Sequence, residues 1–166
     1  LTDADGAKLI KGLPVLIVTN PRKSAGILSA WFYGEPMRDL FSIGITGTNG
    51  KTTVSTLCHQ IFQSAGQETG LIGTVETRIG TEVLSSTRTT PESAELQSLV
   101  ATMRERHCRN LVMEVSSHAI TLERIRGSYF AAVGFTNLSQ DHLDFHGSMD
   151  EYFLAKSKLF TYEYAD

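Results

Sequence analysis

The residues best suited to chemistry lie in one glycine-rich stretch, Gly44–Thr53. It follows an apolar run and precedes a segment with helical spacing of apolar residues. Glycines allow backbone N–H groups to curl around phosphate oxygens, and a helix N-terminus adds a partial positive charge. In such loops the lysine reaches the outer phosphates and the next hydroxyl ligates Mg²⁺. The stretch therefore predicts a phosphate-binding loop made of Gly47, Thr48, Asn49, Gly50, Lys51, Thr52 and Thr53.

The loop departs from the strict phosphate-loop pattern at one position. Ile45 stands where the pattern has its first glycine, five residues before Gly50. Gly47 must then shape the turn in a variant loop. The alternative is a glycine-rich turn with an incidental lysine, but the position between strand and helix favours phosphate binding.

A carboxylate lies near the end of a second apolar run, where Glu114 occurs within Leu111–Val115. A buried carboxylate is costly unless it is paired or bound to a metal. An acid at the C-terminal end of a neighbouring strand is typical of a second Mg²⁺ ligand. The alternative is a solvent-exposed glutamate at a sheet edge. The polar residues that follow favour the site, because ligands bind at the carboxyl ends of strands in such sheets.

A third polar cluster, residues 137–147, follows the apolar run Phe130–Thr136 and contains two aspartates and two histidines. Its spacing is not that of a structural zinc site, and its oxygen donors favour Mg²⁺ with one imidazole. Alone, the cluster is equally consistent with a solvated loop. Three polar clusters at one edge of a sheet favour a shared site.

Lys156 occupies the apolar face of the last helical pattern, which is marked by Met149, Tyr152, Phe153, Leu159 and Phe160. One interpretation is a lysine whose stem packs while its charge reaches water. The other is a partly desolvated amine with a lowered pKa. A neutral amine can react with CO₂ to form a carbamate, which would make Lys156 an anionic Mg²⁺ ligand.

The elements around these clusters alternate between strand and helix. Apolar runs predict buried strands at Phe41–Thr46, Leu111–Val115 and Phe130–Thr136, and Leu71–Ile79 with Glu82–Leu84 predicts a β-hairpin. Helices are expected after Gly50, after a Thr90 N-cap with Pro91 in the first turn, and after a Ser148 capping box. The order predicts an α/β fold, a mostly parallel sheet with helices on both faces.

Composition limits the function classes. The 166 residues carry a net charge of −3 and are 41% hydrophobic, which suits one packed domain and argues against a broad nucleic-acid or anionic-membrane surface. The two cysteines favour a reduced, cytoplasmic protein, and no apolar run reaches the ~18 residues that span a bilayer. We expect residues 1–40 to be the tail of a preceding domain, with an apolar helix face at Ile27, Leu28, Trp31 and Phe32.

Taken together, the motifs resemble the Mur ligase family over Phe41 to Phe160. The resemblance rests on Thr46–Thr53, Thr89–Pro91, Glu114–His118, Asn137–Asp144 and Ala155-Lys156. The Thr-Thr-Pro and Glu-Val-Ser-Ser-His stretches are most similar to the members that add the third amino acid of the peptidoglycan precursor.

The resemblance implies a three-domain protein in which residues 1–40 end the N-terminal UDP-binding domain and residues 41–166 form an incomplete central ATP-binding domain. The C-terminal domain would be absent from this chain. The implied activity is an ATP- and Mg²⁺-dependent ligase that joins an amino acid, diaminopimelate or lysine, to UDP-MurNAc-L-Ala-D-Glu through an acyl phosphate. The implied protein is a cytoplasmic monomer with no nucleic-acid or membrane partner.

Residue roles follow from the same resemblance. Contacts with the UDP-MurNAc-dipeptide are implied for Thr89, Thr90, Ser116 and Arg124, and metal binding for Thr52, Glu114, His142 and carbamylated Lys156. Catalytic roles are implied for Lys51, His142 and Lys156. The alternatives are a related Mur, folylpolyglutamate or cyanophycin-type ligase, or a nucleotide-binding module without turnover.

Overall fold

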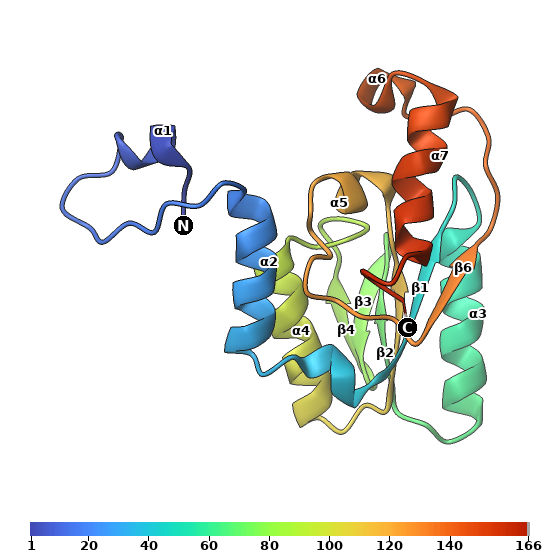
Figure 1. Cartoon of the computed structure of the whole chain (residues 1–166). Helices are drawn as coiled ribbons and strands as arrows, with labels where there is room; N and C mark the ends of the chain where they lie inside the picture. Colours follow the sequence, from blue (N-terminus) through green and yellow to red (C-terminus); the bar gives the residue numbers. More distant parts are fainter. Residues whose placement is uncertain (166) are drawn as a thin grey trace.

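Six strands form one mostly parallel sheet in the order β4-β3-β2-β5-β1-β6 (Figure 1). The computed structural model describes residues 1–165. Its parallel strands are β1 (Phe41–Thr46), β2 (Thr69–Ile72), β5 (Asn110–Glu114) and β6 (Ala132–Phe135). The antiparallel strands β3 (Glu76–Ile79) and β4 (Glu82–Ser85) continue the sheet beyond β2. The predicted α/β class is confirmed.

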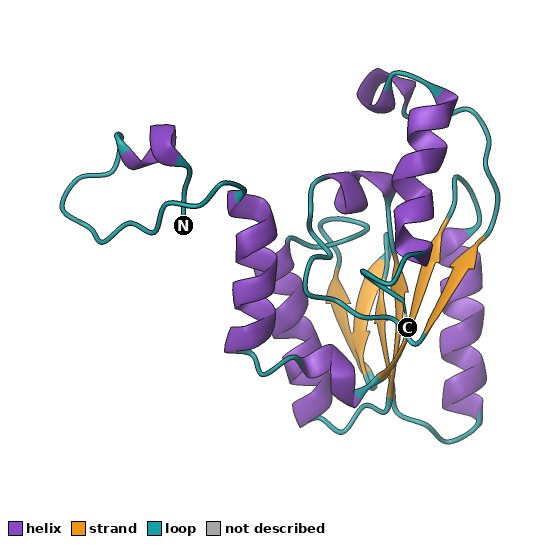
Figure 2. Cartoon of the chain, viewed as in Figure 1, coloured by secondary structure: helices purple, strands orange, loops and turns teal. Residues whose placement is uncertain are grey.

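Helices cover both faces of this sheet (Figure 2). The helix α3 (Lys51–Ser64) packs on β1, β2 and β5, whereas α4 (Ser93–Glu105) packs on the opposite face with α2 (Pro21–Phe32) outside it. The helices α5, α6 and α7 gather at the end of the sheet where the glycine-rich loop lies (Figure 1). The remaining helical segments are α1 (Ala4–Ala7), η1 (Pro36–Asp39), α5 (Ser117–Thr121), α6 (Leu143–His146), α7 (Met149–Ser157) and η2 (Lys158–Phe160).

The central strand β5 is buried on both faces, as its apolar sequence predicts. Leu111 and Met113 face the larger core on the α4 side, and Val112 faces a smaller core beneath α3. This alternation holds β5 in one register between β1 and β2. The end of β5, and with it Glu114, is therefore fixed by packing. None of the helices within residues 1–165 is long and apolar enough to cross a membrane.

The expected single strand over 71–79 is wrong, because the chain turns between β2 and β3. The backbone N–H of Gly73 donates to the carbonyl of Glu76 at 3.1 Å and closes this turn. A Cβ on Gly73 would lie 2.6 Å from Oε1 of Glu114, so only glycine lets the backbone pass this carboxylate. The hairpin around Gly80 and Thr81 is confirmed.

The expected N-cap of the second helix is also wrong. The helix α4 begins at Ser93 with Glu92 in the N-cap position. The Thr90 hydroxyl instead donates to the backbone carbonyl of Glu114 at 2.9 Å and accepts from the N–H of Ser116 at 3.1 Å. A residue predicted to start a helix thus joins two chain segments at the end of β5.

The expected apolar face lies on α2 and is exposed in this chain. Trp31 and Phe32 are 71% and 74% exposed, while the buried residues of α2 are Gly26 and Ala30. A Cβ on Gly26 would lie 2.6 Å from the side chain and backbone of Arg126. Small residues let α2 approach the domain closely, so its large apolar side chains point away.

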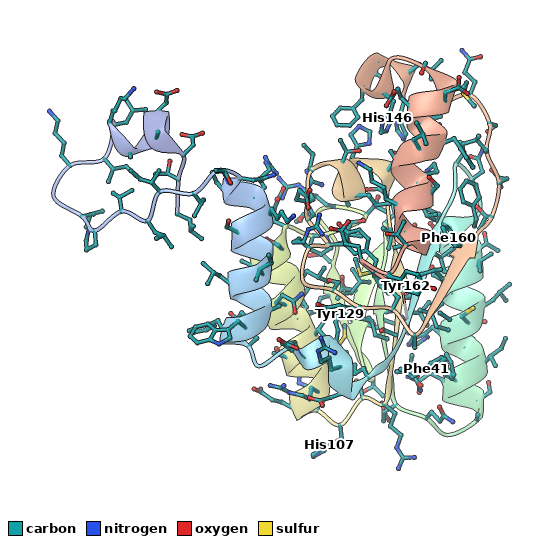
Figure 3. All side chains as sticks on the ribbon, in the orientation of Figure 1. Phe41, His107, Tyr129, His146, Phe160 and Tyr162 are labelled. Carbon is teal, nitrogen blue, oxygen red and sulfur yellow. The ribbon has the colours of Figure 1, made fainter. Side chains whose placement is uncertain are left out.

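The buried face of α7 also differs from the expected one. Tyr152, Lys156 and Leu159 are almost fully buried, but Phe153 and Phe160 are 48% and 44% exposed. Phe160 lies instead beside β6 (Figure 3). The 3-10 turn η2 replaces the last turn of the expected helix, which rotates Phe160 off the buried stripe. The placement of Lys156 on the buried face is confirmed.

Candidate active site

The glycine-rich loop connects β1 to the N-terminus of α3 in a shape that suits an anion. Gly50 is the N-cap with φ of 84° and, within residues 1–165, no side chain caps this end. The first backbone N–H groups of α3, a helix of 14 residues, are thus available for hydrogen bonds. Gly47 has φ of 139°, and a Cβ there would lie 2.0 Å from the Thr136 hydroxyl. Both glycines have the positive φ that favours glycine, Gly47 also has no room for a side chain, and the resulting loop can curl around phosphate oxygens.

Hydrogen bonds from the segment after β6 hold this loop in place. The Thr48 N–H donates to the carbonyl of Asn137 at 2.9 Å, and the Asn49 N–H donates to Asn137 Oδ1 at 3.1 Å. Asn137 Nδ2 and the Thr136 hydroxyl both donate to the carbonyl of Asn49, at 2.9 and 2.6 Å. The chain's own hydrogen bonds therefore hold the loop in one shape, which limits the entropy lost on binding.

A buried carboxylate and two hydroxyls meet beside the loop. Glu114 is 1% exposed, and the Thr52 hydroxyl donates to its Oε2 at 3.1 Å. The Thr74 hydroxyl donates to the same Oε2 at 3.0 Å, and the Thr74 N–H donates to Oε1 at 2.9 Å. Carboxylate and hydroxyl oxygens are the donors that Mg²⁺ prefers, so this set fits such an ion. The structure brings the predicted Thr52 and Glu114 into contact.

Two lysines converge on one carbonyl of the loop. Lys51 Nζ donates to the carbonyls of Gly47 and Thr48 at 2.8 and 2.9 Å, and Lys156 Nζ donates to the carbonyl of Gly47 at 2.9 Å. Burial lowers the pKa of Lys51. Burial, together with the nearby Lys51 charge, lowers the pKa of Lys156 to about 8. Lys156 is 1% exposed, so the interpretation of a lysine that reaches water is wrong.

The histidine predicted to bind a metal lies at the outer side of this edge. The ring of His142 is 4.8 Å from that of His118 and 6.1 Å from that of Tyr152. His142 Nε2 is 3.6 Å from Asp141 Oδ2. Within residues 1–165, no three His, Cys, Asp or Glu side chains gather closely enough to hold a metal ion. The role of His142 stays a prediction.

Three of the four residues predicted to contact substrate lie around the end of β5. Thr90 bonds to the backbone of both Glu114 and Ser116, and the Thr89 hydroxyl lies 3.0 Å from the Thr74 hydroxyl. The Ser116 hydroxyl is the N-cap of α5 and accepts from the N–H of Ala119. The fourth residue, Arg124, forms an ion pair with Glu92, with Nε 2.9 Å from Oε1.

Sequence reasoning missed two contacts at this edge. Thr74 follows the end of β2 and contacts Glu114, but the sequence pattern puts Thr74 inside an expected strand over 71–79 and so gives no signal for this contact. His146 Nε2 lies 2.9 Å from the Ser117 hydroxyl and links α6 to α5. Figure 3 shows His146 beside α6 and α7. No sequence spacing indicates this second contact, because it depends on how two loops fold toward each other.

We expect Glu114→Gln to weaken Mg²⁺-dependent nucleotide binding by about tenfold or more, since one charge-assisted contact is worth about 1.5–3 kcal/mol. The amide keeps the carboxylate's size but loses its charge and one acceptor. Calorimetry measures the nucleotide affinity of Glu114→Gln and of the unsubstituted chain, once with Mg²⁺ and once with EDTA. Glu105→Gln, on the last turn of α4, is a matched control. An equal loss with EDTA would show that Glu114 supports the loop but holds no metal.

The fold and the residues at the carboxyl ends of its strands define an α/β protein with a glycine-rich loop between a central strand and the following helix. Residues 45–165 match the Mur ligase middle domain family, and the chain belongs to this family.

Named relatives share most of this chain. It is 52% identical over 163 residues to the UDP-N-acetylmuramoyl-L-alanyl-D-glutamate–2,6-diaminopimelate ligase of Streptomyces coelicolor, covering 97% of the chain and 32% of the relative. The identity to the ligase of the same name from Aquifex aeolicus is 48% over 149 residues, covering 90% of the chain and 31% of the relative. The chain thus spans about a third of the length of these relatives.

Solved structures agree with this assignment. A structure of a UDP-N-acetylmuramoyl-L-alanyl-D-glutamate–2,6-diaminopimelate ligase superposes with a TM-score of 0.75 at 27% identity, covering 91% of this chain and 31% of the other. E. coli FolC in complex with DHPP and ADP superposes with a TM-score of 0.60 at 18% identity, covering 93% of this chain and 42% of the other. The second likeness shows a shared fold.

Proposed function

We propose that this chain is the nucleotide-binding part of an ATP-dependent ligase that adds diaminopimelate to UDP-MurNAc-L-Ala-D-Glu. The substrates come from the printed names of relatives that are about half identical to the chain. Residues 1–40 would end the N-terminal UDP-binding domain, and 41–166 would form most of the central ATP-binding domain. The protein would act as a monomer in the cytoplasm.

One observation carries the nucleotide part of this proposal. The Thr52 hydroxyl, at the start of α3, contacts the Glu114 carboxylate, at the end of β5. This contact places an oxygen-donor set for Mg²⁺ beside the open N-terminus of α3. A magnesium ion there would neutralise phosphate charge. Gly47, Thr48, Asn49, Gly50, Lys51, Thr52 and Thr53 would hold the phosphates.

The other proposed roles belong to groups around the same edge. Thr89, Thr90 and Ser116 lie close to Glu114 and would orient the dipeptide end of the substrate, together with Arg124. Lys51 would supply positive charge to the transferred phosphoryl group. His142 and carbamylated Lys156 would complete the metal site. No nucleophilic side chain is needed, because the substrate carboxylate would attack the γ-phosphate and release ADP, and the amine would then displace phosphate from the acyl phosphate.

The test separates binding from turnover. We expect the 166-residue chain to bind ATP with Mg²⁺ but to form no tripeptide product, because the parts that would deliver the amine lie in the two thirds of the relatives that the chain does not match. Calorimetry measures binding, and ADP release with UDP-MurNAc-L-Ala-D-Glu and diaminopimelate measures turnover.

Three outcomes would change this proposal. Tripeptide product from this chain alone would refute the proposal that the chain binds ATP but needs other parts of the protein for turnover. ADP release by the whole protein with a folate substrate and glutamate, but not with the muramyl dipeptide, would identify a folylpolyglutamate-type ligase. Binding without turnover by the whole protein would indicate a nucleotide-binding module.

A further inference from the structure

Tyr152 is a buried residue at the candidate site to which neither the motifs nor the proposed mechanism assign a role. It lies in α7 and is 1% exposed. Its hydroxyl lies 3.2 Å from the Thr48 hydroxyl in the glycine-rich loop. The Nζ of Lys156 lies 4.4 Å from the centre of its ring. Tyr152 therefore contacts both the loop and the amine that donates to the loop.

The hydrogen bonds of Thr48 are compatible with Tyr152 as a donor to it. A threonine hydroxyl donates once and accepts twice. The N–H of Ser139 donates to Thr48 Oγ1 at 3.1 Å, and the Thr48 hydroxyl can donate to the carbonyl of Ser139 at 3.2 Å. When Thr48 donates to Ser139, its second acceptor site is left for the Tyr152 O–H. The Thr48 hydroxyl then makes one hydrogen bond as donor and two as acceptor.

The ring of Tyr152 has a second effect, on Lys156. An ammonium over an aromatic face is attracted by the ring's quadrupole, more strongly where water is excluded. The two residues are four apart in α7 and so lie on the same face of the helix. From this face Tyr152 reaches Thr48 while Lys156 reaches the carbonyl of Gly47. One turn of α7 thus holds two successive residues of the loop.

We propose that Tyr152 is a positioning residue that fixes the glycine-rich loop in its nucleotide-binding shape through its hydroxyl bond to Thr48. The inference rests on the proposed nucleotide site and adds to it a residue outside the motif. The hydroxyl of Tyr152 acts on the loop through Thr48, while its ring lies against Lys156. The other residues that hold the loop, Thr136 and Asn137, come from the segment after β6, so α7 supplies an independent support.

The experiment measures the affinity of the chain for ATP with Mg²⁺ in a double-mutant cycle. We expect Tyr152→Phe, which keeps the ring and removes the hydroxyl, to weaken binding about fivefold. Thr48→Val should weaken it by at least as much, and Tyr152→Phe should have no further effect in the Thr48→Val chain. Thr48→Ser keeps the hydroxyl and should retain most of the affinity.

Tyr164→Phe is the matched control, since Tyr164 is also 1% exposed but its ring faces Arg126, 5.3 Å away. The Tyr164→Phe chain should bind ATP with the same affinity as the unsubstituted chain. Unchanged binding in Tyr152→Phe, or effects of Tyr152→Phe and Thr48→Val that simply add, would overturn the inference while leaving the proposed function standing. An equal loss in Tyr164→Phe would also overturn it. Failure of the unsubstituted chain to bind ATP would overturn both.

Discussion

Lys51→Ala is expected to abolish ATP-dependent turnover in the whole protein, with a loss of about a hundredfold or more, while the fold stays intact. Lys51 Nζ donates to the carbonyls of Gly47 and Thr48, so it already lies across the loop that would receive the phosphates. Removing a charged donor there costs about 1.5–3 kcal/mol, which weakens nucleotide binding by about tenfold or more. Turnover should fall further, because the charge that develops during phosphoryl transfer loses one of the cations that would stabilise it.

The control is Lys158→Ala, a substitution of an exposed lysine at the end of α7. It should bind ATP and turn over as the unsubstituted protein does. Circular dichroism and calorimetric affinity are measured on both variants. Loss of the folded signal in Lys51→Ala would mean that Lys51 is needed mainly for the loop's own structure. Full activity in that variant would remove Lys51 from the site.

Much of the scaffold could be predicted because its signals are local. The buried strands at Phe41–Thr46 and Leu111–Val115 are mostly apolar runs, and the structure places β1 and β5 there within one residue at each end. The Ser148 cap is likewise a short-range feature, and its hydroxyl does accept from the N–H of Glu151. Such signals need no knowledge of distant partners.

The errors share a physical cause, which is competition from tertiary contacts. Threonine is a residue type typical of N-caps, but the backbone at the end of β5 offers the Thr90 hydroxyl two partners. The helix α4 therefore starts later, at Ser93. The expected strand over 71–79 is interrupted by the turn that the Gly73 N–H closes on the Glu76 carbonyl, and Gly73 leaves room there for the Glu114 carboxylate. Both of these errors lie beside the end of β5, at the candidate site.

The same reasoning explains why Thr74 and Tyr152 were missed while Lys156 was found. Lys156 is a charged residue on the apolar face of a helix, so the pattern itself indicates that it is unusual. Tyr152 on the same face fits the apolar pattern. A threonine after a strand is equally unremarkable. Only the fold shows that Tyr152 and Thr74 direct their hydroxyls at Thr48 and Glu114. Residues that fit the pattern and still carry function are invisible to pattern reasoning.

Lys156→Arg is expected to reduce turnover of the whole protein as severely as Lys156→Ala does, by about a hundredfold or more. The Lys156 amine is almost fully buried, and burial with the neighbouring Lys51 charge lowers its pKa to about 8. A substantial fraction of this amine is therefore neutral near that pH and can react with CO₂. Arginine stays protonated throughout and forms no carbamate.

Affinity measurements separate this chemistry from support of the loop. Arginine can still donate to the carbonyl of Gly47, as Lys156 does at 2.9 Å, so Lys156→Arg should lose less ATP affinity than Lys156→Ala. Turnover should fall equally in both. A small carboxylic acid such as acetate should partly restore turnover to Lys156→Ala, because its oxygens can enter the vacated space and act as the missing ligand. Lys158→Arg is the control and should behave as the unsubstituted protein. If Lys156→Arg keeps near-normal turnover, the carbamate role is excluded, and the amine's bond to the carbonyl of Gly47 is its whole contribution.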